Sequence, residues 1–240
     1  MNKDTGTGTP MDTDIHLIRL MTWLSPSFPV GAFAFSHGLE HAVDRGDVTD
    51  ADTVIRWVEG ILAFGAGRTD AALFRNAHEA VGENDEARLA RAVEWGATLR
   101  PTAELALESA AQGRAFLDQM TRAWPDRRLD AWKQALAATD REAAYPIAVG
   151  VACALRQIPL RPALTAYLHA FAANLVSAVV RLVPLGQTDG QRALAALEAA
   201  VVACTDAALR RRADDYGGAA LTVDWHSTQH ETQYTRLFRS

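Results

Sequence analysis

Apolar residues recur at three- and four-residue spacing along most of this chain, which is the spacing of an amphipathic α-helix. The clearest case follows a helix cap at Thr49 or Asp50. Its apolar positions fall on one helical face: Val54, Trp57, Val58, Ile61 and Leu62. The alternation of apolar and polar residues that is typical of strands does not occur. The pattern therefore predicts an all-α protein.

Prolines and glycines divide the helical pattern into segments. Two prolines and a glycine in residues 25–31 prevent a helix from continuing through that stretch. The predicted helices comprise residues 14–24, 32–44, a segment from 49 or 50, 69–80, 85–100, 101–121, 129–138, 146–157, 163–183 and a segment that Thr188 or Asp189 caps. No internal repeat or linker separates two halves, so we expect a single multi-helix bundle.

The segment 163–183 is the most apolar of the chain, and its apolar positions surround most of the helix. Such a helix is typical of the centre of a bundle, and we predict that it is the central, buried helix. Its length would also span a bilayer, but His169, Asn174 and Arg181 argue against a membrane span. Because an unpaired buried charge is costly, Arg181 is expected to pair with carbonyls or a carboxylate, or to line a wet channel or interface.

The two ends of the chain differ from the middle. Residues 1–13 are rich in Gly, Thr and Asp and are expected to form a disordered lead-in to an all-helical domain at 14–216. Residues 217–240 carry aromatic and arginine side chains without a sustained period. We expect this C-terminal tail to remain mobile until it orders on a partner, so that its removal leaves the domain folded.

Composition narrows the function classes. The chain contains 46 alanines, the strongest helix formers, and a formal net charge of -5. The acidic balance argues against nucleic-acid binding, and no basic run suggests membrane attachment. Cys153 and Cys204 lie in apolar helical patterns and are expected to be buried thiols. With no secretory signal in the opening residues, a cytoplasmic location is expected.

Candidate chemistry is limited to histidines, since the chain has no phosphate-binding loop, nucleophile elbow or zinc-protease motif. His37 and His41 are four residues apart, as are His226 and His230, and on a helix each pair would share a face. Two ligands do not make a tight metal site. The alternative hypothesis is a metal-dependent helical-bundle hydrolase. It would use His37 with His41, or another pair: Asp70 with His78.

Three ungapped blocks resemble one known family. They are residues 24–40 (LSPSFPVGAFAFSHGLE), 174–192 (NLVSAVVRLVPLGQTDGQR) and 230–240 (HETQYTRLFRS). In this order they resemble the signatures of the UreF family of urease accessory proteins. The resemblance extends from about residue 15 to residue 240, although residues 65–145 carry no block of the family.

The resemblance implies an all-α homodimer that acts as a non-catalytic maturation factor. Members of the family bridge the accessory protein UreD, also called UreH, and the GTPase UreG in a complex that delivers nickel to apo-urease. Regulation of GTP hydrolysis by UreG is also implied. Nickel and GTP would then be handled by the partners, and the chain itself would need no cofactor.

The same blocks supply the expected partner-binding residues. In residues 25–40 we expect Phe33 and Glu40 to bind while Phe35 packs in the core. In the tail, we expect Arg236 to matter more for assembly with UreD than Arg239 does. The complete predicted set is Phe33, Glu40, Arg181, Gln187, Asp189, Arg192, Tyr234, Arg236 and Phe238.

Overall fold

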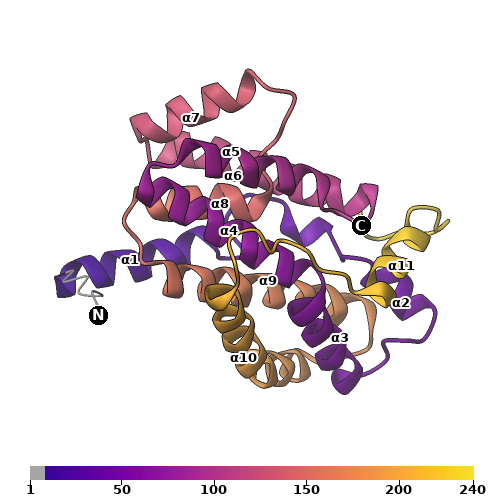
Figure 1. Ribbon diagram of the computed structural model, residues 1–240. Helices are drawn as coiled ribbons and strands as arrows, with labels where there is room; N and C mark the ends of the chain where they lie inside the picture. The colour runs from indigo at the N-terminus through magenta and orange to yellow at the C-terminus, as the bar shows by residue number, and fades with distance from the viewer. Residues whose placement is uncertain (1–8) are drawn as a thin grey trace.

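The computed structural model describes residues 9–240, and all regular structure in this range is helical (Figure 1). The elements are α1 (Pro10–Trp23), the 3₁₀ helix η1 (Ala32–Ala34), α2 (Leu39–Asp44), α3 (Ala51–Phe64), α4 (Ala66–Glu83), α5 (Glu86–Thr98), α6 (Ala103–Ala123), α7 (Arg127–Ala137), α8 (Tyr145–Leu155), α9 (Leu160–Leu182), α10 (Gln187–Arg210) and α11 (Leu221–His230). The predicted all-α class is confirmed.

Helix starts follow local capping chemistry where a cap is present. Asp50 caps α3 as predicted, and its side chain accepts a hydrogen bond from the backbone N–H of Thr53. Helix α1 begins earlier than expected, because Thr9 caps it and residues 10–13 form its first turn. The rest of the predicted lead-in, residues 1–8, lies outside the described residues. Helix α10 also begins earlier, at Gln187 after Gly186, so neither Thr188 nor Asp189 is its cap.

The expected helix 32–44 is broken into η1 and α2. Gly31 and Gly38 have φ angles of +75° and +76°, and His37 has φ +58°. These left-handed conformations cannot belong to a continuous α-helix. The break turns the chain back between η1 and α2, and this turn forms one wall of the site described below.

The most enclosed helix of the molecule is α8. Helix α8 packs against α4, α5, α6, α7 and α9. Almost every residue of α8 is buried, and its small side chains allow this close packing on all sides. Helix α9 packs against α2, α3, α4, α8, α10 and η1, but several of its positions remain exposed. Helix α9 thus contacts six elements, as predicted for the hub of the bundle, but it is only half-buried, and α8 is the more enclosed helix.

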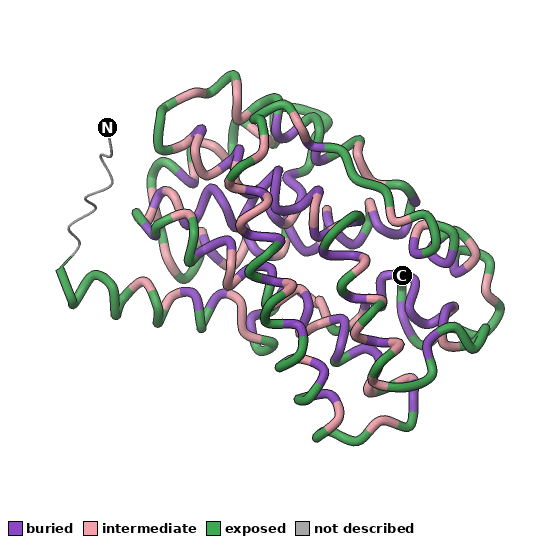
Figure 2. Tube along the Cα trace, turned by 60° about the horizontal axis from the view of Figure 1, so that its bottom comes forward, coloured by how far each residue is buried: buried purple, intermediate pink, exposed green. Residues whose placement is uncertain are grey.

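Within the described range, α9 is the one helix long and apolar enough to cross a membrane, with a mean hydropathy of 1.6. Half of its most apolar window is buried inside the bundle. Burial in the core accounts for its apolar composition, since core helices of globular proteins pass the same test. Figure 2 shows the buried positions gathered inside the bundle, whereas α1 extends from it with mostly exposed residues.

Gly113 allows α6 to approach the beginning of α8. A Cβ atom at this position would overlap the carbonyl oxygen of Ala143 and lie 3.1 Å from the backbone of Ala144. We expect Gly113→Ala to lower the free energy of unfolding by at least about 2 kcal/mol, because backbone atoms must move apart. Gly60→Ala is the matched control, since Gly60 is a helical glycine whose added Cβ meets no atom within 4 Å.

The two variants are to be compared by urea unfolding. Gly60→Ala should equal or exceed the wild-type stability, because alanine is favoured over glycine in a helix by about 1 kcal/mol. Equal stability of the two variants would show that α6 and α8 do not pack as closely as described.

Candidate functional site

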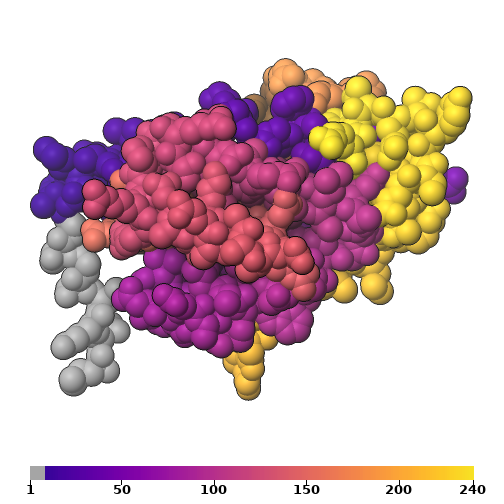
Figure 3. All heavy atoms as spheres, turned by 90° about the horizontal axis from the view of Figure 1, so that it is seen from above, coloured from indigo at the N-terminus to yellow at the C-terminus, as the bar shows by residue number. Residues whose placement is uncertain are grey.

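Segments that are distant in the sequence meet around the last residues of the chain. The backbone N–H of Arg239 donates to the carbonyl of Ala34 at 2.8 Å, and that of Ser36 donates to the backbone oxygen of Ser240 at 2.7 Å. In Figure 3 the yellow C-terminal residues lie against the indigo segment that contains η1 and against magenta α6. Two of the three blocks singled out in the sequence, 24–40 and 230–240, are therefore parts of one site.

Four side chains hold the C-terminal segment, and we call them the C-terminal seat: Ser36, Glu40, Glu104 and Glu108. The first two come from the turn before α2 and from α2, and the other two lie four residues apart on one face of α6. All four are buried. Helix α6 begins at the cap Thr102, whose hydroxyl also hydrogen-bonds the Ser227 hydroxyl of α11 at 2.8 Å. That contact ties the start of α6 to α11.

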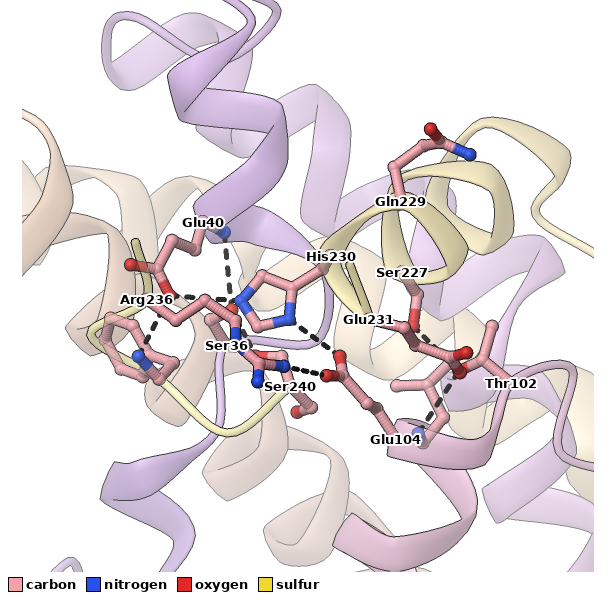
Figure 4. A network of polar contacts seen from close by, with 12 residues as sticks. Ser36, Glu40, Thr102, Glu104, Ser227, Gln229, His230, Glu231, Arg236 and Ser240 are labelled. Atoms are coloured by element: carbon pink, nitrogen blue, oxygen red, sulfur yellow. Dashed lines mark hydrogen bonds and ion pairs between the residues drawn. The ribbon is translucent and has the colours of Figure 1, made fainter. Parts of the chain in front are cut away.

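Glu40 anchors the chain after α11. Its Oε1 accepts from the backbone N–H of Leu237 at 2.6 Å, and its Oε2 accepts from that of Phe238 at 2.9 Å (Figure 4). The same Oε2 lies 3.1 Å from Nε2 of His230. A buried carboxylate is costly unless its oxygens are fully hydrogen-bonded, and here the chain itself supplies all the donors. Glu40 is thus a structural anchor and does not face outward, contrary to the binding role expected for it.

His230 is fully buried between two carboxylates. Its Nδ1 lies 2.7 Å from Oε2 of Glu104, opposite the Nε2 contact to Glu40. Each ring nitrogen of His230 therefore faces a carboxylate oxygen from a different helix. Glu104 also receives Nη1 of Arg236 on its other oxygen at 2.8 Å. Arg236, Glu104, His230 and Glu40 form one continuous chain of polar contacts, in that order (Figure 4).

Glu108 binds the end of the segment. Its Oε2 accepts from the Ser240 hydroxyl at 2.9 Å and lies 3.3 Å from Nδ1 of His37. Burial by itself would raise the pKa of Glu108, but His37 and the hydrogen bonds from His37 and Ser240 outweigh it and hold this pKa below its ordinary value. Glu108 therefore stays ionised at neutral pH and remains an acceptor.

Arg181 connects α9 to this site. Its Nη1 donates to the carbonyl of Phe33 at 2.8 Å and its Nε donates to that of Ser177 at 3.2 Å. Its guanidinium also lies 4.4 Å from the ring centroid of Phe238. The predicted pairing with carbonyls is confirmed. The residue itself is exposed, because it lies at the end of α9 where the helix leaves the core.

The side chains left on the outside of this site are aromatic and aliphatic. Phe33 is 70% exposed, Leu237 is 67% exposed and Tyr234 is fully exposed. Phe35, by contrast, is buried as predicted, and so is Phe238. We call the exposed set Phe33, Tyr234 and Leu237 the seat rim. Large exposed apolar groups on an ordered backbone are a common mark of an interaction surface.

Comparison with known proteins shows the family of this chain. The family model UreF matches residues 48–198, more than half of the chain. This chain belongs to the UreF family. A urease accessory protein UreF of Rhodopseudomonas palustris strain HaA2 is 50% identical over 224 residues, which is 93% of both chains. The UreF of Rhodopseudomonas palustris strain BisB5 is 47% identical over 99% of this chain and 97% of its own. That of Xanthobacter autotrophicus is 47% identical over 98% and 96%.

The middle UreF block, residues 174–192, is divided between the end of α9 and the first turns of α10. Asn174 and Arg181 lie on α9 beside η1, where Asn174 donates to the carbonyl of Ala32 at 3.2 Å. The other predicted residues of this block stand in the first turns of α10, where Asp189 pairs with Arg192 at 2.9 Å and Gln187 is exposed. Across residues 9–240, no hydrogen bond or ion pair joins the three α10 residues to the seat.

The predicted histidine pairs do not share a metal position. His37 faces Glu108, whereas His41 faces His226 from α11 at 2.9 Å. Asp70 accepts from Tyr167, and His78, two turns further along α4, contacts the carbonyl of Ile158. Among the described residues, no three His, Cys, Asp or Glu side chains are grouped as metal ligands. Within residues 9–240, the residues named for a metal-dependent hydrolase are therefore not brought together at one metal site.

The C-terminal tail differs most from expectation. Residues 221–230 form α11, which buries Val223, His226, Ser227 and His230. The expectation that the tail cannot bury itself on its own domain is wrong. Apolar periodicity does not detect this segment, because it is buried through polar side chains paired with acids of α2 and α6. The available signal was the pair Glu104 and Glu108, two acids on the buried face of a helix.

Proposed function

We propose that this chain is a non-catalytic maturation factor of urease. On this proposal it bridges UreD, also called UreH, and the GTPase UreG, in a complex that delivers nickel to apo-urease. The relatives are named urease accessory proteins. Two of the three family blocks, residues 24–40 and 230–240, meet at the C-terminal site that carries the seat rim. Nickel and GTP would belong to the partners. A homodimer, a cytoplasmic location and control of GTP hydrolysis by UreG are parts of the same proposal.

The observation that carries the proposal is the seat rim. Glu40 binds the backbone of Leu237 and Arg181 binds that of Phe33, so little backbone conformational entropy remains to be lost at these two positions on binding. Aromatic anchors next to arginines are the usual composition of energetically dominant interface positions. Arg236 and Arg239 lie on the same segment as Tyr234 and Leu237, and Arg181 of α9 donates to the carbonyl of Phe33. We assign this surface to UreD.

Bridging requires a second surface apart from the first. The first turns of α10 offer one, because Gln187, Asp189 and Arg192 are not linked to the seat by polar contacts within residues 9–240. A protein with two separate binding surfaces can hold two partners at once. We propose that the α10 surface contributes to the second contact.

The test is co-purification with UreD. Tyr234→Ala and Phe33→Ala each remove an exposed ring without a buried contact, so melting temperatures should not change. Each should weaken binding by at least tenfold, the size expected for an anchor residue worth more than about 1.4 kcal/mol. Phe64→Ala is the matched control, since Phe64 is an aromatic residue of α3 that is 64% exposed. Unchanged binding by both rim variants would contradict the assignment.

The two arginines give a finer test of the same surface. Arg236 pairs with buried Glu104, whereas Arg239 lies over the Phe35 ring at 5.6 Å. We expect Arg236→Ala to weaken assembly more than Arg239→Ala, because only Arg236 leaves a buried carboxylate short of a partner. A stronger effect of Arg239→Ala would show that the arginines act directly on the partner and not through the seat.

A further inference from the structure

Residues 234–240 are attached to the rest of the chain mainly through acidic side chains. Only Phe238 and Ser240 of this segment are buried, so little apolar surface holds it in place. Besides the contacts to Ala34 and Ser36 described above, its hydrogen bonds to the helical domain go to three acids of the C-terminal seat: Glu40, Glu104 and Glu108. The attachment therefore depends on the charge of these acids.

Glu40 accepts hydrogen bonds from the segment on both of its oxygens. The backbone N–H of Leu237 donates to Oε1 at 2.6 Å, and that of Phe238 donates to Oε2 at 2.9 Å. Hydrogen bonds to an ionised carboxylate are about twice as strong as those between neutral groups. A proton on Glu40 would weaken both bonds, and its buried O–H would become a new donor that needs an acceptor of its own.

The ionisation of Glu108 is coupled to the attachment of Ser240. Burial raises the pKa of Glu108, but His37 and the hydrogen bonds from His37 and Ser240 together bring it below its ordinary value. Release of Ser240 removes one of these groups and raises this pKa, so a proton on Glu108 favours the released segment. The contribution of Glu108 to attachment is thus present above the ordinary glutamate pKa of about 4.3, and it is lost as the pH falls through the lower pKa of the attached state.

Basic groups from several elements face the three acids and the segment. They are His37 and Arg100 beside Glu108, His230 between Glu40 and Glu104, Arg236 beside Glu104, and Arg181 of α9 over the Phe238 ring. Asp70 lines the same small cavity as Glu108 and pairs with Arg100 at 2.7 Å. Tyr145 and Tyr167 line it too, and burial raises the pKa of both, so they stay neutral. Protonation of the three acids would leave the basic groups with less compensating charge.

We propose that Glu40, Glu104 and Glu108 form an acid-sensitive latch, which releases residues 234–240 at low pH while the helical domain stays folded. The core around α4, α8 and α9 is held by apolar packing, which does not depend on protonation. Tyr234 and Leu237 of the seat rim lie on the latched segment, so its release would also move two of the three rim side chains. The latch does not depend on the proposed role in urease maturation.

The experiment is a pH titration of the ¹⁵N-labelled full-length protein, followed by nuclear magnetic resonance from pH 7 downward. Below about pH 5, we expect the amide signals of Leu237 and Phe238 to move to the positions of an unstructured chain. In the same samples, the amide signals of Val149 and Val151, which are buried in α8, should keep their folded positions. A single transition in which the α8 and Phe238 signals are lost together would overturn the proposal.

A variant without one of the titrating groups tests the mechanism. Each proton taken up on release changes the ratio of released to attached segment by up to tenfold per pH unit. Glu108→Gln keeps one acceptor oxygen for Ser240 but takes up no proton, so its transition should be less steep than that of the wild type by up to this factor. The matched control is Glu59→Gln, at an exposed glutamate of α3, which should titrate as the wild type does.

A second variant covers the case in which Glu108→Gln has already released the segment at pH 7. Ser240→Ala leaves Glu108 in place but removes the hydroxyl that couples it to the segment. Its transition should therefore lose steepness as well. Equal steepness in Glu59→Gln and in the variant that remains attached at pH 7 would show that Glu108 does not act in a latch.

Discussion

Removal of residues 219–240 is expected to destabilise the protein strongly. The deletion takes away α11 and the buried Phe238, and it strips the hydrogen-bond partners from Glu40, Glu104 and Glu108. Leaving a buried charge unpaired typically costs about 3–5 kcal/mol. At about 2–4 °C per kcal/mol for a protein of this size, the melting temperature should fall by roughly 10 °C or more.

Differential scanning calorimetry of the shortened chain provides the measurement. Tyr234→Ala serves as the control, since it alters the same segment at a fully exposed side chain and should melt as the wild type does. A shortened protein that melts within about 2 °C of the full chain would restore the view of the tail as an independent, partner-ordered segment. The outcome therefore decides whether partner binding orders the tail or uses a tail that is already ordered.

Replacement of Glu40 alone should have the second largest effect. Glu40→Ala leaves the backbone N–H groups of Leu237 and Phe238 without their acceptor and leaves His230 with a single carboxylate. We expect a loss of about 3–5 kcal/mol in the free energy of unfolding. Glu40→Gln should lose less, about 1–3 kcal/mol, because the amide keeps one acceptor oxygen.

Urea unfolding measures the loss of stability, and limited proteolysis measures the release of the C-terminal segment. In Glu40→Ala, cleavage should appear first within residues 231–240, since these residues lose their anchor. Glu59→Ala is the control, because Glu59 is an exposed glutamate of α3. If Glu40→Ala and Glu59→Ala were equally stable and equally resistant, the seat would not hold the segment.

Sequence patterns determined the helices, because helix formation depends on short-range spacing and capping. The local sequence was enough to predict the apolar face of α3, its cap Asp50 and the break at residues 25–31. The prediction that Phe35 packs in the core is also confirmed, although Phe35 lies in the break between η1 and α2 and not on a helix. The UreF resemblance identified which blocks matter, although it could not show their contacts.

Which helix is the most enclosed depends on tertiary packing. Helix α9 is the longer apolar run, yet α8 is the enclosed one, because α8 has the small side chains that neighbours can approach from all sides. Close approach is a property of pairs of helices, as Gly113 of α6 against Ala143 illustrates. Composition along one helix does not reveal it.

The site was decided by the tertiary structure as well. The sequence by itself determined an all-α chain of the UreF family and the three blocks that carry its specialised residues. It did not show that Glu40 faces inward while Phe33 faces outward, or that Glu104 meets His230. Polar pairs between residues more than 100 positions apart leave no periodic trace. Their stability comes from mutual desolvation and pairing, which exists only once α2, α6 and α11 are packed together.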